Sequence, residues 1–278
     1  MISGTAAAES SPWRFIDSGP LPGATNMAAD MAITQVLGRE PAPPTLRVYQ
    51  WSRPTISLGY HQSEKDIDLL RCSQDGIDVV YRPTGGRAIL HDNEVTYAVI
   101  LPPSSSFFAL DIFGVYEFIS RCLVHALQSL NIDADFERAK KTPDGFSRGE
   151  LSTLCYASSI QYEIAIQGRK LVGSAQRRIH NSVLQHGSIL LGDEHLAVAH
   201  YLAGHDDQWR HRVHQYLKKQ TVSINQLTRT PVTRQQMIAA LRQGFAEELR
   251  ISFTDGQLSN EEMKQSELLR SKFAILEN

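Results

Sequence analysis

Apolar side chains recur at helical spacing in three parts of the chain. The clearest pattern predicts a helix over residues 111–131, where apolar residues recur at i, i+3, i+4 and i+7. A first helix is expected between Asn26, a residue type that caps helix N-termini, and Gly38, a residue type that ends helices. A third helical region is predicted after Pro231, with an apolar face formed by Met237, Ile238, Leu241, Phe245 and Leu249.

Strand-like runs fill much of the chain before Leu191. Short stretches rich in β-branched and aromatic residues predict strands where Gly, Pro, Asn or Asp bound them. They cover residues 46–51, 55–60, 77–82, 95–101 and 188–191, with a short helix expected around 67–70. Strands therefore dominate the first part of the chain and helices the last. This order predicts the α+β fold class, with a mixed, mostly antiparallel sheet flanked by helices.

Residues 161–176 are expected to form a hairpin whose turn is Gln167-Gly168. This turn places Ala165 opposite Lys170. It also puts Lys170 on the more polar face of the hairpin, the face that carries Glu163.

A single domain is expected from residue 13 to residue 278, with the predicted C-terminal helices as part of it. Residues 1–12 are small and polar and are predicted to be a disordered lead-in. Residues 137–159 show no periodicity and contain Pro143, Gly145 and Gly149. A loop of this length is either a functional lid or disordered.

Composition narrows the functional classes. With 28 basic and 30 acidic residues the net charge is −2, so no global basic excess points to nucleic acid or an anionic membrane as a partner. No apolar run approaches the ~18 residues of a membrane span. The three cysteines form no CxxC pair or Cys/His cluster, which argues against a metal site and a disulfide scaffold. We therefore expect a cytoplasmic protein in a reducing environment.

The stretch YRPTGGRAILHD contains two adjacent glycines between two arginines. Gly85 and Gly86 allow a ligand to approach the backbone closely, and Arg82 and Arg87 could hold a carboxylate or phosphate. The stretch matches neither a phosphate-binding GK[ST] loop nor a dinucleotide fingerprint. A glycine turn with solvated arginines explains these residues equally well, and His91 is either a substrate contact or part of a turn.

Only one of the three cysteines is a candidate for chemistry. Cys122 lies on the apolar stripe of the predicted helix, and Cys72 has no base nearby, so both are predicted to be structural. Cys155 lies in the long loop, and Lys170 is the nearest downstream cation in a glycine-rich segment. Cys155 is either a nucleophile that Lys170 activates or an inert loop cysteine. In an extended chain Cys155 lies ~30 Å from Ala165, so the loop must fold back for the pair to meet.

Histidines offer one further candidate. His186-Gly187 precedes an apolar run, where the imidazole either reaches a site or is a hydrogen-bonded structural group. His205, His211 and His214 lie in a polar segment without a carboxylate at metal-ligand spacing, and they are predicted to be on the surface.

Four stretches taken together resemble one family. WRFIDSGPLPGATNMAADMAI, YRPTGGRAILHDNEVTYAVI, GRKLVGSAQRR and LQHGSILL occur in the order and spacing of the lipoate–protein ligase and octanoyltransferase superfamily, from about Trp13 to the final helix. Within it, the chain most resembles the cysteine octanoyltransferases of the Bacillus type. There a Cys and a WYEL-like strand precede a GRKVAGSAQ-like stretch, so CYASSIQYEI before GRKLVGSAQ puts Cys155 and Lys170 on the family's nucleophile and its partner lysine.

The resemblance implies the catalytic-domain fold shared by biotin and lipoate ligases. It implies transfer of an octanoyl group from octanoyl-acyl carrier protein, through a Cys155 thioester, to a lysine of a lipoyl domain. The acceptor would be the glycine cleavage H protein or the E2 subunit of a 2-oxoacid dehydrogenase. No cofactor is implied. The residues expected to line the acyl pocket or its carbonyl end are Arg82, Thr84, Gly85, Gly86, His91, Gly173, Ser174, Ala175, His186 and Gly187.

Three alternatives stay open within this resemblance. An ATP-dependent lipoate or octanoate ligase would use ATP and Mg²⁺ and leave Cys155 idle. An amidotransferase would move octanoyl between lipoyl domains with the same Cys and Lys. A carrier-binding or regulatory relative would have lost catalysis, although the presence of both Cys155 and Lys170 argues against this.

Overall fold

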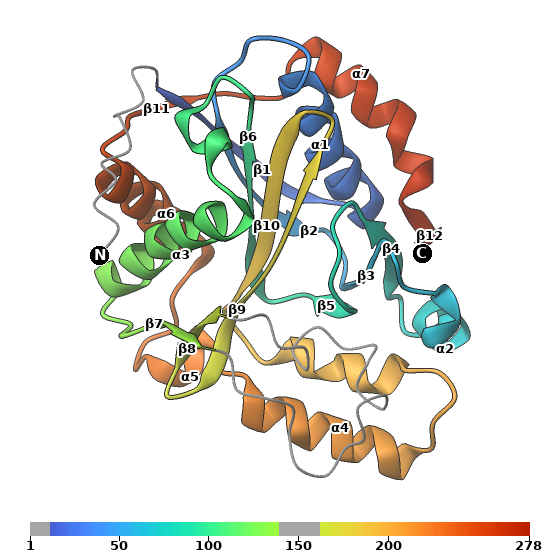
Figure 1. The fold of residues 1–278 in the computed structure, drawn as a ribbon. Helices are drawn as coiled ribbons and strands as arrows, with labels where there is room; N and C mark the ends of the chain where they lie inside the picture. Colours follow the sequence, from blue (N-terminus) through green and yellow to red (C-terminus); the bar gives the residue numbers. More distant parts are fainter. Residues whose placement is uncertain (1–11, 139–161) are drawn as a thin grey trace.

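The structure is a computed structural model that describes residues 12–138 and 162–278 (Figure 1). Cys155, nearly all of the expected 137–159 loop and residues 1–11 of the expected lead-in lie outside the described residues.

The described strands form two sheets, where the sequence suggested one. The larger sheet has eight strands. In spatial order they are β11 (Phe253–Asp255), β1 (Trp13–Leu21), β2 (Thr45–Trp51), β6 (Glu94–Leu101), β10 (Ser182–Leu190), β9 (Arg169–Ile179), β8 (Tyr162–Ile166) and β7 (Asp135–Arg138). The smaller sheet has four, in the order β12 (Ala274–Leu276), β4 (Asp78–Arg82), β3 (Thr55–Gly59) and β5 (Ile89–His91).

Most strand pairs are antiparallel. The parallel pairs are β1 with β11, β1 with β2, and β3 with β4. The prediction of a mixed, mostly antiparallel arrangement flanked by helices is therefore confirmed. The three-residue edge strands β11 and β12 were not predicted, because each pairs with a strand far away in sequence: Phe253 pairs with Trp13, and Ala274 pairs with Val80.

Helices cover both faces of the larger sheet (Figure 1). On one face, α3 (Ile112–Ser129) and α6 (Arg234–Leu249) pack over β1, β2, β6 and β10. On the other face, α1 (Gly23–Leu37) lies between the two sheets, and α7 (Asn260–Leu269) packs against α1. Below the smaller sheet lie the 3₁₀ helix η4 (Glu194–Tyr201) and α4 (Asp207–Gln220). The short helices are α2 (Leu69–Gln74), α5 (Ile224–Leu227) and 3₁₀ turns at 64–66, 106–109 and 270–272.

Helix α1 begins earlier than predicted. It starts at Gly23, and the side chain of Asn26 is not its cap. The Asn26 amide instead donates hydrogen bonds to the carbonyls of Leu21 and Gln50, at 3.1 and 2.8 Å, and so ties the helix to two strands. All of its residues except Thr25 are buried, because sheets lie on both sides. The expected stop at Gly38 is confirmed.

Helix α3 and the hairpin follow the sequence prediction closely. The Asp111 carboxylate caps α3 by accepting from the Gly114 amide at 2.7 Å. Gln167 and Gly168 both have positive φ, at 53° and 71°, as a two-residue hairpin turn requires. Ala165 faces Lys170 across β8 and β9, as predicted.

No helix in the described ranges 12–138 and 162–278 is long and apolar enough to cross a membrane.

Helix α6 crosses α3 closely at Gly244. A Cβ atom added there would lie 2.7 Å from both the Cys122 carbonyl oxygen and the Ala126 nitrogen. We predict that Gly244→Leu lowers the free energy of unfolding by about 3 kcal/mol, because the two helix backbones must separate. Chemical denaturation measures this. Gln243→Leu, at the exposed neighbouring position, should have little effect, and an equal loss in both variants would contradict the close-crossing explanation.

Candidate functional site

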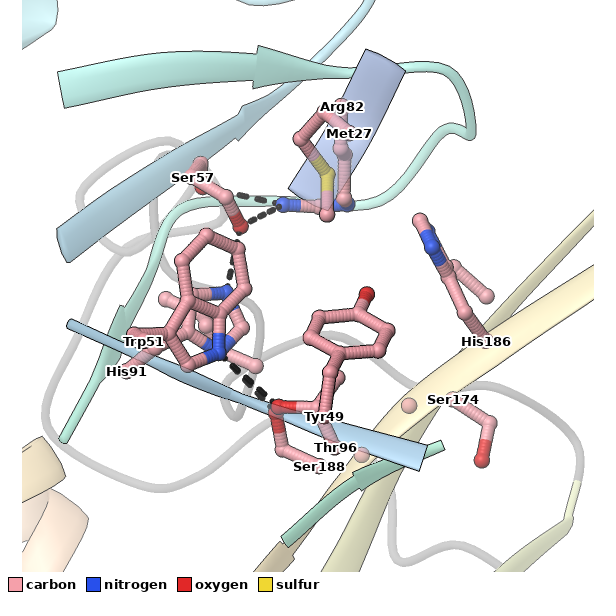
Figure 2. Close-up of a pocket in the computed structure, with 14 residues that line it drawn as sticks. Met27, Tyr49, Trp51, Ser57, Arg82, His91, Thr96, Ser174, His186 and Ser188 are labelled. Atoms are coloured by element: carbon pink, nitrogen blue, oxygen red, sulfur yellow. Dashed lines mark hydrogen bonds between the residues drawn. The ribbon is translucent and has the colours of Figure 1, made fainter. Parts of the chain in front are cut away.

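A cavity lies where the two sheets meet α1 (Figure 2). Its volume is about 360 Å³, including the open space at its entrance. Strands of the larger sheet form one wall and β3, β4 and β5 of the smaller sheet form the other. The residues that line it are Met27, Tyr49, Trp51, Ser57, Arg82, Ile89, His91, Thr96, Gly173, Ser174, Ala175, His186, Gly187 and Ser188. Its size suits a small ligand.

Trp51 and His91 join the two sheets across the cavity wall. Their rings stack with centroids 4.1 Å apart and planes at 13°. The indole Nε1 donates to the Thr96 hydroxyl at 2.8 Å, which fixes the ring. The stack gives the cavity a flat and rigid aromatic surface.

Hydrogen bonds hold both nitrogens of His91. Nδ1 donates to Glu94 Oε1 at 2.8 Å, and Nε2 lies 2.7 Å from the Ser57 hydroxyl. Burial on its own raises the pKa of Glu94, but His91 and the hydroxyls of Thr96 and Ser188 hold it below its usual value. Glu94 is therefore an ionised carboxylate that orients His91.

His186 belongs to a second network. Its Nδ1 donates to Asp30 Oδ2 at 3.0 Å, and its Nε2 accepts from the Thr84 hydroxyl at 2.7 Å. Burial lowers the pKa of His186, and Arg82 adds to this, although Asp30 opposes it. The ring is therefore neutral at pH 7, with its proton on the nitrogen that faces Asp30.

Asp30 is the centre of this network. Its other oxygen, Oδ1, accepts from Arg47 Nη1 at 2.7 Å, and both side chains are fully buried. The Tyr49 hydroxyl also donates to Asp30, at 2.9 Å. Burial raises the pKa of Asp30, but Arg47 and His186 hold it below its usual value. The carboxylate thus stays charged without contact with water.

Sequence reasoning missed Asp30, Arg47 and the Trp51–His91 stack. A signal for the first two was present. Asp30 interrupts the apolar run NMAADMAI, and Arg47 interrupts the apolar strand LRVYQW. A charge inside an otherwise buried element implies a partner, because an unpaired buried charge is too costly.

Arg82 is buried and holds the glycine loop from within. Its guanidinium donates to the carbonyls of Ser57, Gly85 and Arg87, at 2.8 to 3.1 Å, and it also lines the cavity. The alternative of a solvated arginine is therefore wrong for Arg82. Gly86 has a positive φ of 89° and its carbonyl passes so close to Gly59 that a Cβ there would lie 2.2 Å away.

A bulge in β9 puts Lys170 and Val172 on opposite faces of the sheet. Ala165 pairs with Lys170, but the next residue back, Ile164, pairs with Val172, so Leu171 is an extra residue in β9. Val172 and Ile164 face the core under α3 and α6. Without the extra residue, Lys170 would share the face of Val172. With it, Lys170 lies on the opposite face, where Gly173 and Ala175 line the cavity.

Lys170 is paired with a carboxylate. Its Nζ donates to Glu163 Oε1 at 2.8 Å, and its side chain is only 3% exposed. Tyr216 on α4 lies close to this pair, and burial, with Glu163, raises the pKa of Tyr216. Lys170 is on the same face of β9 as Gly173 and Ala175, but it is not one of the residues that line the cavity.

The structure brings most of the expected pocket residues together. Seven of them line the cavity: Arg82, His91, Gly173, Ser174, Ala175, His186 and Gly187. Thr84 lies behind His186, and Gly85 and Gly86 form the loop that Arg82 holds. The geometry of Cys155 lies outside the described residues.

The remaining candidates behave as structural or surface residues. Cys72 and Cys122 are fully buried, and burial raises the pKa of the Cys72 thiol to about 12. His205 and His211 are exposed, and His214 is half-buried. In the described part of the chain, no group of three or more His, Cys, Asp or Glu residues could hold a metal ion.

Comparison with known proteins identifies the group to which this architecture is similar. The model of the lipoyl protein ligase A/B catalytic domain matches residues 22–246. Octanoyltransferase LipM of Kyrpidia tusciae is 40% identical over 266 residues, which cover 94% of this chain and 96% of that protein. The resemblance inferred from the four sequence stretches is thereby confirmed.

Two solved structures share the fold. Lipoate-protein ligase A bound with ATP superposes with a TM-score of 0.74 at 20% identity, covering 94% of this chain and 95% of that one. A bipartite lipoate protein ligase from Thermoplasma acidophilum, studied with its E2 lipoyl domain, gives 0.73 at 21%, covering 94% and 92%. At these identities the likeness concerns the fold alone, and it confirms the expected ligase-type catalytic-domain fold.

The lowered pKa of His186 predicts a pH-dependent stability. As pH falls, the unfolded imidazole takes up a proton near pH 6.5. The buried ring stays neutral to lower pH, so protons favour the unfolded chain. The contribution of neutral His186 to the free energy of unfolding is therefore fully present above about pH 6.5. It is lost as pH falls from there towards the pKa of His186 in the folded protein.

We therefore predict that wild-type unfolding free energy falls between about pH 6.5 and pH 5, and that His186→Gln shows a shallower fall. Denaturant titrations over this range measure both slopes. Burial also lowers the pKa of His195, so part of the fall of unfolding free energy with pH should persist in His186→Gln. His211→Gln, at an exposed position, is the control. If the unfolding free energy of His186→Gln fell with pH as steeply as that of the wild type, His186 would not be a source of the pH dependence.

Proposed function

The chain belongs to the lipoyl protein ligase A/B catalytic-domain family and is an octanoyltransferase of protein lipoylation, and from this premise we propose its donor, route and acceptor. The donor is octanoyl-acyl carrier protein. The octanoyl group passes through a thioester on Cys155 to a lysine of a lipoyl domain. Glycine cleavage H protein, or the E2 subunit of a 2-oxoacid dehydrogenase, is the acceptor.

One observation carries the proposal: the bulge at Leu171 puts Lys170 on the same face of β9 as Gly173, which lines the cavity together with the apolar side chains of Met27, Trp51 and Ile89. The apolar lining suits an alkyl chain, and the cation beside it suits a carbonyl on which negative charge develops. The chain's high identity to octanoyltransferase LipM supports an acyl group as the cargo.

The proposed first step is thioester exchange. The Cys155 thiolate attacks the octanoyl carbonyl, a new C–S bond forms, the donor C–S bond breaks, and the donor thiol leaves with a proton. The ammonium of Lys170 favours the thiolate and stabilises the oxyanion. One thioester replaces another at nearly equal free energy, so we propose no need for ATP or metal.

The second step forms the amide. The neutral amine of the acceptor lysine attacks the Cys155 thioester, the C–N bond forms, and the cysteine thiol is released. Conversion of a thioester to an amide is downhill and drives the overall transfer. Glu163 positions Lys170 for both steps, since its carboxylate lies 2.8 Å from Nζ.

Two enzymatic alternatives remain distinct from this proposal. A lipoate or octanoate ligase would require ATP and free acid, with Lys170 holding the adenylate. An amidotransferase would accept octanoyl only from a lipoyl domain. The similarity to LipM over nearly the whole chain favours the transferase, whereas the likeness to lipoate ligases concerns the fold alone.

We predict that incubation with octanoyl-acyl carrier protein gives an octanoyl adduct, visible by intact-protein mass spectrometry, and that Cys155→Ser forms no stable thioester. Cys72→Ala should keep the adduct, because that thiol is fully buried. Addition of apo H protein without ATP should discharge it. Strict dependence on ATP and free octanoate would overturn the transferase route, and an adduct from octanoylated H protein alone would indicate the amidotransferase. A protein inert in all of these assays would indicate a binding role.

We also predict that Lys170→Ala lowers kcat/KM for transfer by about 10²-fold or more, because the developing oxyanion loses its cation. Steady-state transfer to apo H protein measures this. Lys219→Ala, at an exposed position on α4, should change little. Activity of Lys170→Ala equal to that of the wild type would remove Lys170 from the mechanism.

A further inference from the structure

Arg177 lies at the rim of the cavity, and the proposed chemistry does not use it. Strand β9 pairs regularly with β10 from Val172 to Ile179, so Gly173, Ala175 and Arg177 share one face. Gly173 and Ala175 line the cavity. The side chain of Arg177 therefore projects from the cavity face one step beyond the lining.

Two contacts fix the Arg177 guanidinium beside the glycine loop. Nη1 donates to the Pro83 carbonyl at 2.8 Å, and the guanidinium lies 4.0 Å from the ring centroid of Tyr60. Tyr60 is 42% exposed, and a Cβ on Gly85 would lie 3.5 Å from its ring. Arg177 is thus half-buried and pre-oriented at the surface, with further N–H groups beyond the one on Pro83.

Positive charge accumulates around Arg177. Arg39 and Arg177 both lower the pKa of His180, after burial, so the three groups lie near one another. Neither Arg39 nor Arg177 forms an ion pair with a carboxylate in the described ranges, whereas other arginines of this chain, such as Arg14 and Arg242, do. A chain with net charge −2 therefore keeps an uncompensated cationic rim beside its cavity.

We infer that Arg177, supported by Arg39, binds the phosphate of the phosphopantetheine arm that carries the donor acyl group. The inference rests on the proposed function, because it assumes an acyl thioester donor. An arginine binds a phosphate through charge-assisted, often bidentate hydrogen bonds. Arg177 and Arg39 thus select donors that carry an anionic group at a fixed distance from their thioester.

The spacing along β9 fits this role. Arg177 lies seven positions after Lys170, and the bulge at Leu171 removes one of these steps, so their Cα atoms lie about 20 Å apart at ~3.3 Å per residue. An extended phosphopantetheine arm spans about 16 Å from sulfur to phosphorus, by ordinary bond lengths. The long side chains of Lys170 and Arg177 cover the difference. One arm that crosses the mouth of the cavity, above the octanoyl chain, can therefore place its thioester at Lys170 while its phosphate reaches Arg177.

A donor series tests the inference. Transfer is measured from octanoyl-acyl carrier protein, octanoyl-coenzyme A and octanoyl-pantetheine, which lacks the phosphate, with wild type, Arg177→Gln and Arg177→Lys. We expect Arg177→Gln to lower kcat/KM about tenfold for both phosphate-bearing donors and less than twofold for octanoyl-pantetheine, with Arg177→Lys intermediate. Arg242→Gln, on the outer surface of α6, should leave all three donors unchanged. Raising the salt concentration should weaken only the phosphate-bearing donors.

Other outcomes separate the possible explanations. An equal loss with all three donors would mean that Arg177 only supports the Pro83 loop, and no loss with any donor would remove it from recognition. Both results overturn the inference. Calorimetric binding of acyl-free 4′-phosphopantetheine and pantetheine gives a readout that needs no transfer. Phosphate-dependent binding that Arg177→Gln abolishes would support the inference even if the Cys155 route failed, and equal binding of both compounds would overturn it.

Discussion

The buried ion pair between Asp30 and Arg47 is the contact on which the cavity depends. Two charges removed from water cost several kcal/mol each, and only close pairing with further hydrogen bonds offsets that cost. Arg47 meets this condition with bonds to Asp30, to the Asn26 side chain and to Ser18. Helix α1 is therefore locked to β2 in one position. The second oxygen of Asp30 then sets the tautomer of His186 and the direction of the Tyr49 hydroxyl, which both face the cavity.

Local features of the fold could be predicted from the sequence. The Gln167-Gly168 turn fixes the pairing of Ala165 with Lys170, because a two-residue turn leaves one register at its ends. The apolar spacing of residues 111–131 and the cap at Asp111 likewise depend on neighbours within one turn. By contrast, the bulge at Leu171 is set by the packing of Val172 against helices far away in sequence, and no local signal marks it.

In the candidate site too, some features follow from the local sequence and others only from the packing of distant elements. The sequence alone marked the Gly85-Gly86 loop and the Gly173-Ser174-Ala175 segment as parts of the site. Glycine is needed for the backbone conformation of the loop, and the segment belongs to a family motif. The cavity itself lies between two sheets whose association depends on α1 and on the Trp51–His91 stack, and strand patterns alone do not place one sheet against another. Arg82 illustrates the limit: its position in the sequence suggested a ligand contact, yet its donors are largely used to build the loop beside the ligand.

The bulge in β9 also constrains how the sequence can change over evolutionary time. The turn at Gln167-Gly168 is exposed or half-exposed, and turns of this kind accept added residues. Between Lys170 and Gly173, however, the number of residues decides which face each side chain takes. Loss of a single codon there would put Lys170 and Val172 on the same face, so either the lysine would enter the apolar layer under α3 and α6 or Val172 would leave it. Length variation in this hairpin should therefore be confined to its tip, and the interval from Lys170 to Gly173 should keep a constant length in every functional descendant.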